Sequence, residues 1–226
     1  MRTQSGYPRG VPNPVLKKIA QELIHHAPFT LAGAAGGIAA ALLMQRVSHN
    51  VSETLFYLFH PAHVFLSAFT TGSMYQLKKC SGSRHGCNPL MLVVIAYTGA
   101  IGVGTLSDSL IPYIGERLMG MTEAHVHIGF IDKWWIIHPV ALLGVAAAYF
   151  FPATKLPHLS HIFVSTAASL FHMLMGMGGV LDPGLAAGVF VFLFLAVWLP
   201  CCLSDIVFPL LFIGEMLDPH PHHPCH

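Results

Sequence analysis

Two histidine pairs are the residues in this sequence whose type and spacing best suit chemistry. His60 and His63 form the first pair, and His158 and His161 form the second, 98 residues later. On a helix, residues three apart are neighbours on one face, so each pair places two imidazoles side by side. Neutral imidazole is a good ligand for zinc, copper, iron and nickel ions. We therefore predict that these four side chains bind a transition-metal ion.

Each pair is followed by a Leu-Ser-Asp motif that places a carboxylate deep in apolar sequence. The aspartates are Asp108 and Asp205, which are 97 residues apart. A charged side chain at the centre of a bilayer costs about 2.5–3.5 kcal/mol on insertion scales, so it usually faces a cavity or a partner. We expect both aspartates to be metal ligands beside the histidines. Serines and cysteines close to these motifs are expected to have supporting or accessory roles: Ser67, Ser107, Ser165, Ser204, Cys201 and Cys202.

A proline follows each aspartate after four residues. Pro112 and Pro209 have no N–H, so the carbonyls of Asp108 and Asp205 lose their helical donors. We expect a kink in each helix and a free carbonyl oxygen beside each carboxylate, an arrangement that suits a cation. An aspartate that stabilises the kink through hydrogen bonds is the alternative interpretation.

The matched spacing of the histidine and Leu-Ser-Asp motifs indicates that the chain contains one unit in two copies. Each copy of this repeat ends in a segment rich in histidine. Such segments are typical of metal binding. Ion binding at both ends of a pathway across the membrane fits a transport function. For the second segment, a disordered chain end is the alternative. The residues concerned are Glu123, His125 and His127 in the first copy, and His220, His222 and His223 in the second.

The composition is that of an integral membrane protein, because 54% of the 226 residues are hydrophobic and 9% are charged. The formal net charge of +1 argues against binding to nucleic acid. About 20 predominantly apolar residues are needed for a helix to span a bilayer. Six segments meet this condition: 28–45, 60–78, 89–114, 134–151, 158–178 and 185–214.

Lysine and arginine residues indicate how these segments are oriented, because short cytoplasmic loops carry an excess of both. With the N-terminus inside, eight of them fall on the cytoplasmic side and three outside, so both termini are predicted to be cytoplasmic. A unit of three helices repeated in tandem has its second copy inverted, as in many secondary transporters. In this topology the first histidine pair meets Asp108 in the outer half of the membrane. The second pair meets Asp205 in the inner half, which gives two sites or two halves of one central site.

The predicted fold class is an all-α integral membrane protein, with six transmembrane helices arranged as two inverted three-helix repeats with proline-kinked third helices. The chain divides into four parts. Residues 1–26 are a cytoplasmic segment with an interfacial helix, 27–133 the first repeat, 134–217 the second, inverted repeat, and 218–226 a histidine-rich cytoplasmic tail. The interfacial helix is indicated by apolar residues at helical spacing beside two lysines.

These features predict a membrane transporter or channel for a divalent transition-metal cation of the Zn, Fe, Mn, Ni or Co class. Its partners are the lipid bilayer and the metal ion, and a homo-oligomer is left open. One alternative is an integral-membrane enzyme in which the metal activates water. Another is a b-type cytochrome with paired histidines as haem ligands. Duplication favours transport because an enzyme needs one site, and haem is disfavoured because the two histidine pairs lie at opposite depths in the predicted topology.

Overall fold

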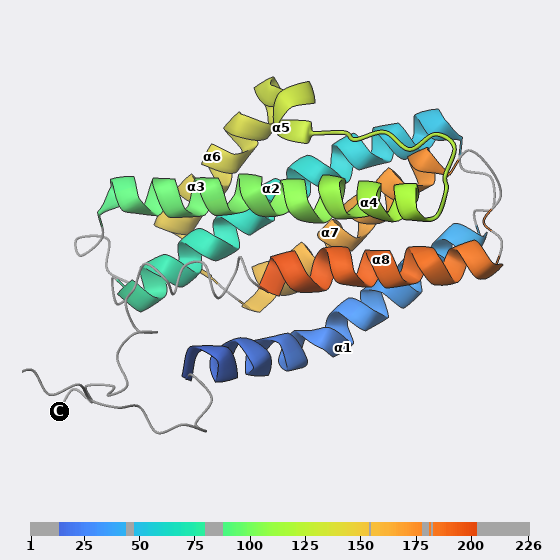
Figure 1. The fold of residues 1–226 in the computed structure, drawn as a ribbon. Coiled ribbons are helices and arrows are strands. Elements are labelled where there is room, and N and C mark those ends of the chain that lie inside the picture. The colour runs from blue at the N-terminus through green and yellow to red at the C-terminus, as the bar shows by residue number, and fades with distance from the viewer. Residues whose placement is uncertain are drawn as a thin grey trace, which may run out of the picture.

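The chain folds into long helices (Figure 1), in a computed structural model that describes residues 14–43, 48–79, 88–153, 155–177, 181 and 183–202. These residues include no β-strand, which confirms the prediction of an all-α chain. The helical elements are, in chain order, α1 (Pro14–Leu43), α2 (His49–Lys79), α3 (Pro89–Thr105), η2 (Leu106–Leu110), α4 (Ile111–Leu118), α5 (Gly129–Asp132), α6 (Trp134–Phe150), α7 (Lys155–Gly176) and α8 (Pro183–Cys202).

Each of the six predicted spans overlaps one long helix of the described residues. The stretches Pro89–Leu118 and Pro183–Cys201 are long and apolar enough to cross a membrane, and Ala27–Ala39 and Trp134–Phe150 are shorter apolar helices. The helices α2 and α7 are less apolar because they carry most of the buried polar side chains. Polar groups on such helices face the interior of the bundle rather than its surface.

The helix α1 is continuous, so the predicted interfacial helix and the first predicted span form a single element. Pro28 lies inside it, and a proline removes a helical hydrogen bond without always ending the helix. Contacts with α7 and α8 hold α1 in the bundle. Trp198 of α8 donates a hydrogen bond to the carbonyl of Leu23 at 2.8 Å, which fixes the part of α1 before the proline.

The start of α3 is fixed by a cap in its own sequence. The side chain of Asn88 accepts hydrogen bonds from the backbone N–H groups of Leu90 and Met91. Pro89 occupies the first turn, where a missing N–H costs nothing. This cap defines where the helix that carries Asp108 begins.

The helix that carries Asp108 continues past Pro112, and its backbone is irregular just before the proline. In Figure 1, α3, η2 and α4 form one unbroken helix. The short element η2 is a turn of π-helix, in which the N–H of Ile111 bonds to the carbonyl of Leu106, five residues earlier. A π turn is one way in which a helix accommodates a disturbed hydrogen-bond ladder.

This π turn releases the carbonyl of Ser107; the free carbonyl that the sequence predicts at Asp108 stays a prediction. At the five-residue spacing, the donor for Ser107 would be Pro112, which has no N–H. The hydroxyl of Ser169 on α7 donates to the Ser107 carbonyl instead, at 2.9 Å. The released oxygen therefore connects two helices, rather than remaining open to a cation.

The helices α2 and α7 form the centre of the bundle. They pack against each other, while α2 also contacts α3 and α6, and α7 also contacts α1 and α8. In Figure 1, α7 runs in the opposite direction to α2, and α8 runs in the opposite direction to the helix formed by α3, η2 and α4. Buried apolar side chains form one cluster between α7, α8 and the start of α2, and another between α2, α3 and α6.

Candidate metal centre

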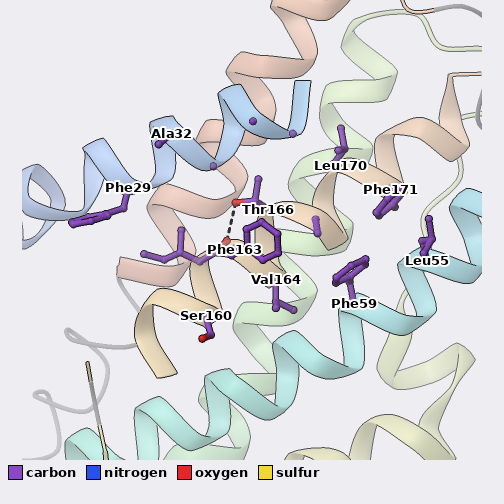
Figure 2. A pocket seen from close by; sticks show the side chains of 15 residues that line it. Phe29, Ala32, Leu55, Phe59, Ser160, Phe163, Val164, Thr166, Leu170 and Phe171 are labelled. Atoms are coloured by element: carbon purple, nitrogen blue, oxygen red, sulfur yellow. Dashed lines mark hydrogen bonds between the residues drawn. The ribbon is translucent and has the colours of Figure 1, made fainter. Parts of the chain in front are cut away.

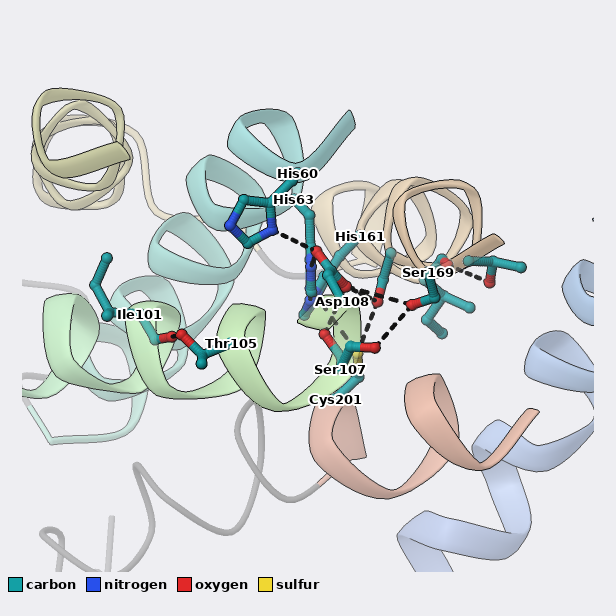
Figure 3. Close-up of polar contacts among 12 residues, drawn as sticks. His60, His63, Ile101, Thr105, Ser107, Asp108, His161, Ser169 and Cys201 are labelled. Atoms are coloured by element: carbon teal, nitrogen blue, oxygen red, sulfur yellow. Dashed lines mark hydrogen bonds and ion pairs between the residues drawn. The ribbon is translucent and has the colours of Figure 1, made fainter. Parts of the chain in front are cut away.

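Asp108 lies within a buried group of polar side chains (Figure 3). Its Oδ2 atom accepts hydrogen bonds from Nδ1 of His60, at 2.9 Å, and from Nδ1 of His63, at 2.6 Å. The two histidines are three residues apart on α2, so one face of that helix presents both rings to η2. The structure therefore brings together the first histidine pair and the first aspartate of the repeat.

The other ring nitrogen of His63 points to the second half of the chain. Nε2 of His63 lies 2.5 Å from Nε2 of His161 on α7, and Sγ of Cys201 on α8 lies 4.0 Å from the same His63 atom. The ligand atoms of these three residues all lie within 4.8 Å of one another, and all three side chains are buried. We call His63, His161, Cys201 and Asp108 the central array.

The hydrogen-bond network indicates which ring nitrogens carry protons. A carboxylate only accepts hydrogen bonds, so Nδ1 of His63 donates to Asp108. In neutral His63 the Nε2 atom then has a lone pair, to which Nε2 of His161 donates its proton. When that proton moves, two nitrogen lone pairs point towards one place beside a thiol. This arrangement can bind a metal ion.

The second oxygen of Asp108 accepts three hydrogen bonds from hydroxyls. Ser107 donates to Oδ1 at 2.6 Å and Ser165 at 3.2 Å, and Ser169, at 3.4 Å, shares its one proton between Oδ1 and the Ser107 carbonyl. Together with the two imidazoles on Oδ2, these give five donors to a side chain that is fully buried. Donors of this kind stabilise the ionised carboxylate and offset the cost of removing it from water.

Some of the residues singled out in the sequence lie away from the central array. Ser67 is buried, and its hydroxyl has no hydrogen-bond partner among the described residues. Glu123 and His125 are exposed in the loop that follows α4, where His127 is half-buried. The remaining predicted residues have side chains outside the described part of the chain: His158, Cys202, Ser204, Asp205, His220, His222 and His223.

Glu116 and His172 form a second buried pair, which the predicted spans did not reveal. Oε1 of Glu116 lies 2.7 Å from Nδ1 of His172, and both residues are buried. The predicted third span ended at residue 114, whereas α4 continues to Leu118 and takes Glu116 into the bundle. A signal was present in the sequence, because Glu116 follows Asp108 by eight residues, about two helical turns.

A cavity of about 1050 Å³ lies beside α7, between α1 and α2 (Figure 2). Its lining is apolar except for Ser160 and Thr166, and the Thr166 hydroxyl donates to the carbonyl of Ile162 at 2.7 Å. No carboxylate, imidazole or thiol is among the described residues that line it. The cavity therefore offers a metal ion no suitable ligand and is separate in chemistry from the central array.

Comparisons with protein-family models, with curated proteins and with solved structures found no match to this chain. The function must therefore be inferred from the geometry of the central array and its surroundings.

Proposed function

We propose that this chain is a membrane transporter or channel for a divalent transition-metal cation, which passes through the central array. The observation that supports this function is the convergence of two imidazole nitrogens and one thiol sulfur within 4.8 Å of one another. Nitrogen and sulfur ligands favour zinc and related ions over magnesium and calcium, which prefer oxygen. For the same reason, zinc, iron, cobalt and nickel suit the array better than manganese does.

Asp108 fits the role of a residue that orients a ligand. A histidine that binds metal through one nitrogen usually donates its other N–H to a carboxylate or carbonyl, which fixes the ring and raises its basicity. His63 has this arrangement, with Nδ1 at Asp108 and Nε2 near Cys201 and the second histidine. Because both oxygens of Asp108 already accept hydrogen bonds, we propose that Asp108 orients His63 and does not itself contact the ion.

A metal ion and a proton compete for the same nitrogen atoms in the central array. Two nitrogens on one tetrahedral ion, at about 2.0–2.1 Å each, are roughly 3.3 Å apart. Nε2 of His63 and Nε2 of His161 are 2.5 Å apart. An ion therefore enters when the shared proton leaves the two Nε2 atoms and the rings separate. Cys201 binds as a thiolate, so each ion bound releases the thiol proton, which provides a way to couple metal and proton movement.

Two observations favour six membrane spans arranged as inverted repeats. His63 and His161 occupy equivalent positions of the repeat and contact each other, as residues next to a two-fold axis do. The helices that carry them run in opposite directions, and so do α8 and the helix of α3, η2 and α4 (Figure 1). Transporters built in this way bind substrate near the bilayer midplane at the interface between the repeats.

The repeat gives Asp108 a counterpart in Asp205, which lies outside the described residues. Ser165 donates to Asp108. The counterpart of Ser165 is Ser67, whose buried hydroxyl has no hydrogen-bond partner in the described part of the chain. The participation of Asp205 in the site stays a prediction from the sequence repeat.

The test of this function is zinc uptake into liposomes that contain the purified protein, together with elemental analysis of the same preparation. We expect bound metal in proportion to protein, and zinc flux that falls in His161→Ala to the level of empty liposomes. His138→Ala is the matched control, because it removes an imidazole that bonds to Tyr97 outside the array. Bound metal without flux would contradict transport and favour a metalloenzyme, and intense visible absorption would favour haem.

A further inference from the structure

The pair of Glu116 and His172 has the same design as the pair of Asp108 and His63. In each, a carboxylate on the helix of α3, η2 and α4 accepts a hydrogen bond from Nδ1 of a histidine on a neighbouring helix. Nε2 of His172 and Oε2 of Glu116 are buried without a hydrogen-bond partner among the described residues. Buried polar atoms are nearly always paired, because leaving one unpaired costs about 1–3 kcal/mol. Nε2 of His172 is therefore a candidate to bind a ligand.

A second imidazole lies beside His172, as in the central array. The ring centroid of His127, in the loop after α4, is 5.5 Å from that of His172, and the ring planes are 75° apart. Two imidazoles that share a tetrahedral ion at about 2.0–2.1 Å from each nitrogen have ring centroids roughly 5 Å apart. The carboxylates of Glu53 and Asp132 are close enough to act electrostatically on His127, and their negative charge favours a cation there.

The surroundings hold this pair in place. Gly176, at the end of α7, leaves room for Glu116, because a Cβ at this position would lie 2.6 Å from the carboxyl carbon. The N–H of Glu123 donates to the carbonyl of Gly176 at 3.3 Å, which connects the loop to α7. Phe56 packs edge-on against the ring of His172, with ring centroids 5.4 Å apart, and supplies an apolar wall.

We propose that Glu116, His172 and His127 form a second binding site for a divalent transition-metal ion, which we call the outer array. His172 and His127 supply nitrogen ligands, and Glu116 orients His172. This inference rests on the proposed function, because it places a second ion position between the loop and the central array. Glu116 follows Asp108 by eight residues, which is about 12 Å along a helix. An ion that passes from one array to the other moves over a distance of this order.

The test measures Co²⁺ binding to the full-length protein by equilibrium dialysis and absorption spectroscopy. Cobalt bound to a thiolate has a strong near-ultraviolet band, which reports the central array, whereas nitrogen and oxygen ligands give weaker visible bands. We expect His172→Ala and His127→Ala each to bind one Co²⁺ ion fewer per chain than the wild type, with the thiolate band retained. His138→Ala, the control outside both arrays, should bind as many ions as the wild type.

Three outcomes would overturn the outer array. They are an unchanged number of bound ions in folded His172→Ala and His127→Ala, an equal loss in His138→Ala, and loss of the thiolate band along with the second ion. If His172→Ala does not fold, as judged by size-exclusion chromatography, cobalt binding to His127→Ala decides the question, because His127 is only half-buried. Absence of the thiolate band from the wild type would count against the proposed function instead, so the two failures can be distinguished.

Discussion

The central and outer arrays share one plan but differ in how firmly their ligands are held. Asp108 accepts hydrogen bonds from two imidazoles and two hydroxyls, and from a third hydroxyl that it shares with the Ser107 carbonyl. Among the described residues, Glu116 accepts one side-chain hydrogen bond, from His172. The ligands of the central array all lie on helices, whereas His127 lies in a loop. The orientation of His63 in the central array is therefore fixed more firmly than the position of His127 in the outer array.

This difference predicts different affinities for the same ion. Ligands whose positions are fixed by their neighbours lose less conformational freedom on binding, so they bind more tightly. We expect tight binding at the central array and weaker binding with faster exchange at the outer array. Conduction requires sites that bind strongly enough for an ion to enter and weakly enough for it to leave, and two unequal sites in series can meet both conditions.

Removal of a central ligand has the largest expected effect. His161→Ala deletes one of the two converging nitrogens, so the Zn²⁺ affinity of the central array should fall by more than the about 10–100-fold typical of losing a supporting residue. Isothermal titration calorimetry measures this change, with His138→Ala as the control. An unchanged affinity would mean that the ion binds elsewhere.

Neutralisation of the two orienting carboxylates should have the next largest effect. Asp108→Asn keeps the shape of the side chain and removes its charge, and we expect about 10–100-fold weaker Zn²⁺ binding at the central array. Glu116→Gln should weaken the outer array by about 10-fold or less, because one hydrogen bond connects Glu116 to His172. Competition with a chromophoric zinc chelator measures both. Equal losses in the two variants would remove the distinction between the arrays.

The position of His60 can be changed without replacing a histidine. A Cβ at Gly129 would overlap Nε2 of His60, so Gly129→Ala should push that ring away from Asp108. Because His60 is not among the three converging ligands, the Zn²⁺ affinity should fall by less than about 10-fold. Gly102→Ala is the control, since no atom lies within 4 Å of a Cβ there. Calorimetry would contradict this account if the two alanine variants bound zinc equally well.

The smallest expected effect concerns pH and the outer array. Burial, reinforced by the neighbouring His172, lowers the pKa of His127 below its usual 6.5. Below about pH 6.5 the unfolded chain therefore binds more protons at this residue than the folded protein does. The stability that His127 contributes is complete above that pH and is lost as the pH falls towards the folded pKa.

The measurement is the thermal unfolding midpoint of the metal-free protein between about pH 7.5 and 5.5, across the range in which histidine titrates. The midpoint should fall less steeply in His127→Gln, which cannot be protonated, than in the wild type. Identical slopes would mean that His127 does not titrate in this way.

The helices could be predicted from the sequence because apolar segments of about 20 residues are distinctive. Helical spacing and depth also placed the first histidine pair near Asp108, and the structure brings these side chains into contact. The sequence left open whether the ligands form two sites or two halves of one. The contact between His63 and His161 depends on how α2 packs against α7, which no local pattern records.

The backbone around Asp108 could not be predicted from residue types alone. Pro112 indicates a disturbed hydrogen-bond ladder, but not that the helix widens into a π turn and continues. The partner of the released Ser107 carbonyl is Ser169, which lies outside every repeated motif and is placed by the packing of α7. Glu116 was missed for a related reason, because an apolar segment shows roughly where a helix lies in a membrane and not where it ends.

X-ray absorption spectroscopy of the full-length protein with one equivalent of Zn²⁺ is the most direct test of the central array. The account predicts nitrogen ligands at about 2.0–2.1 Å and a sulfur ligand at about 2.3 Å, with the sulfur ligand lost in Cys201→Ser. A wild-type spectrum without sulfur, or a sulfur ligand that persists in Cys201→Ser, would contradict the assignment of the ion to His63, His161 and Cys201.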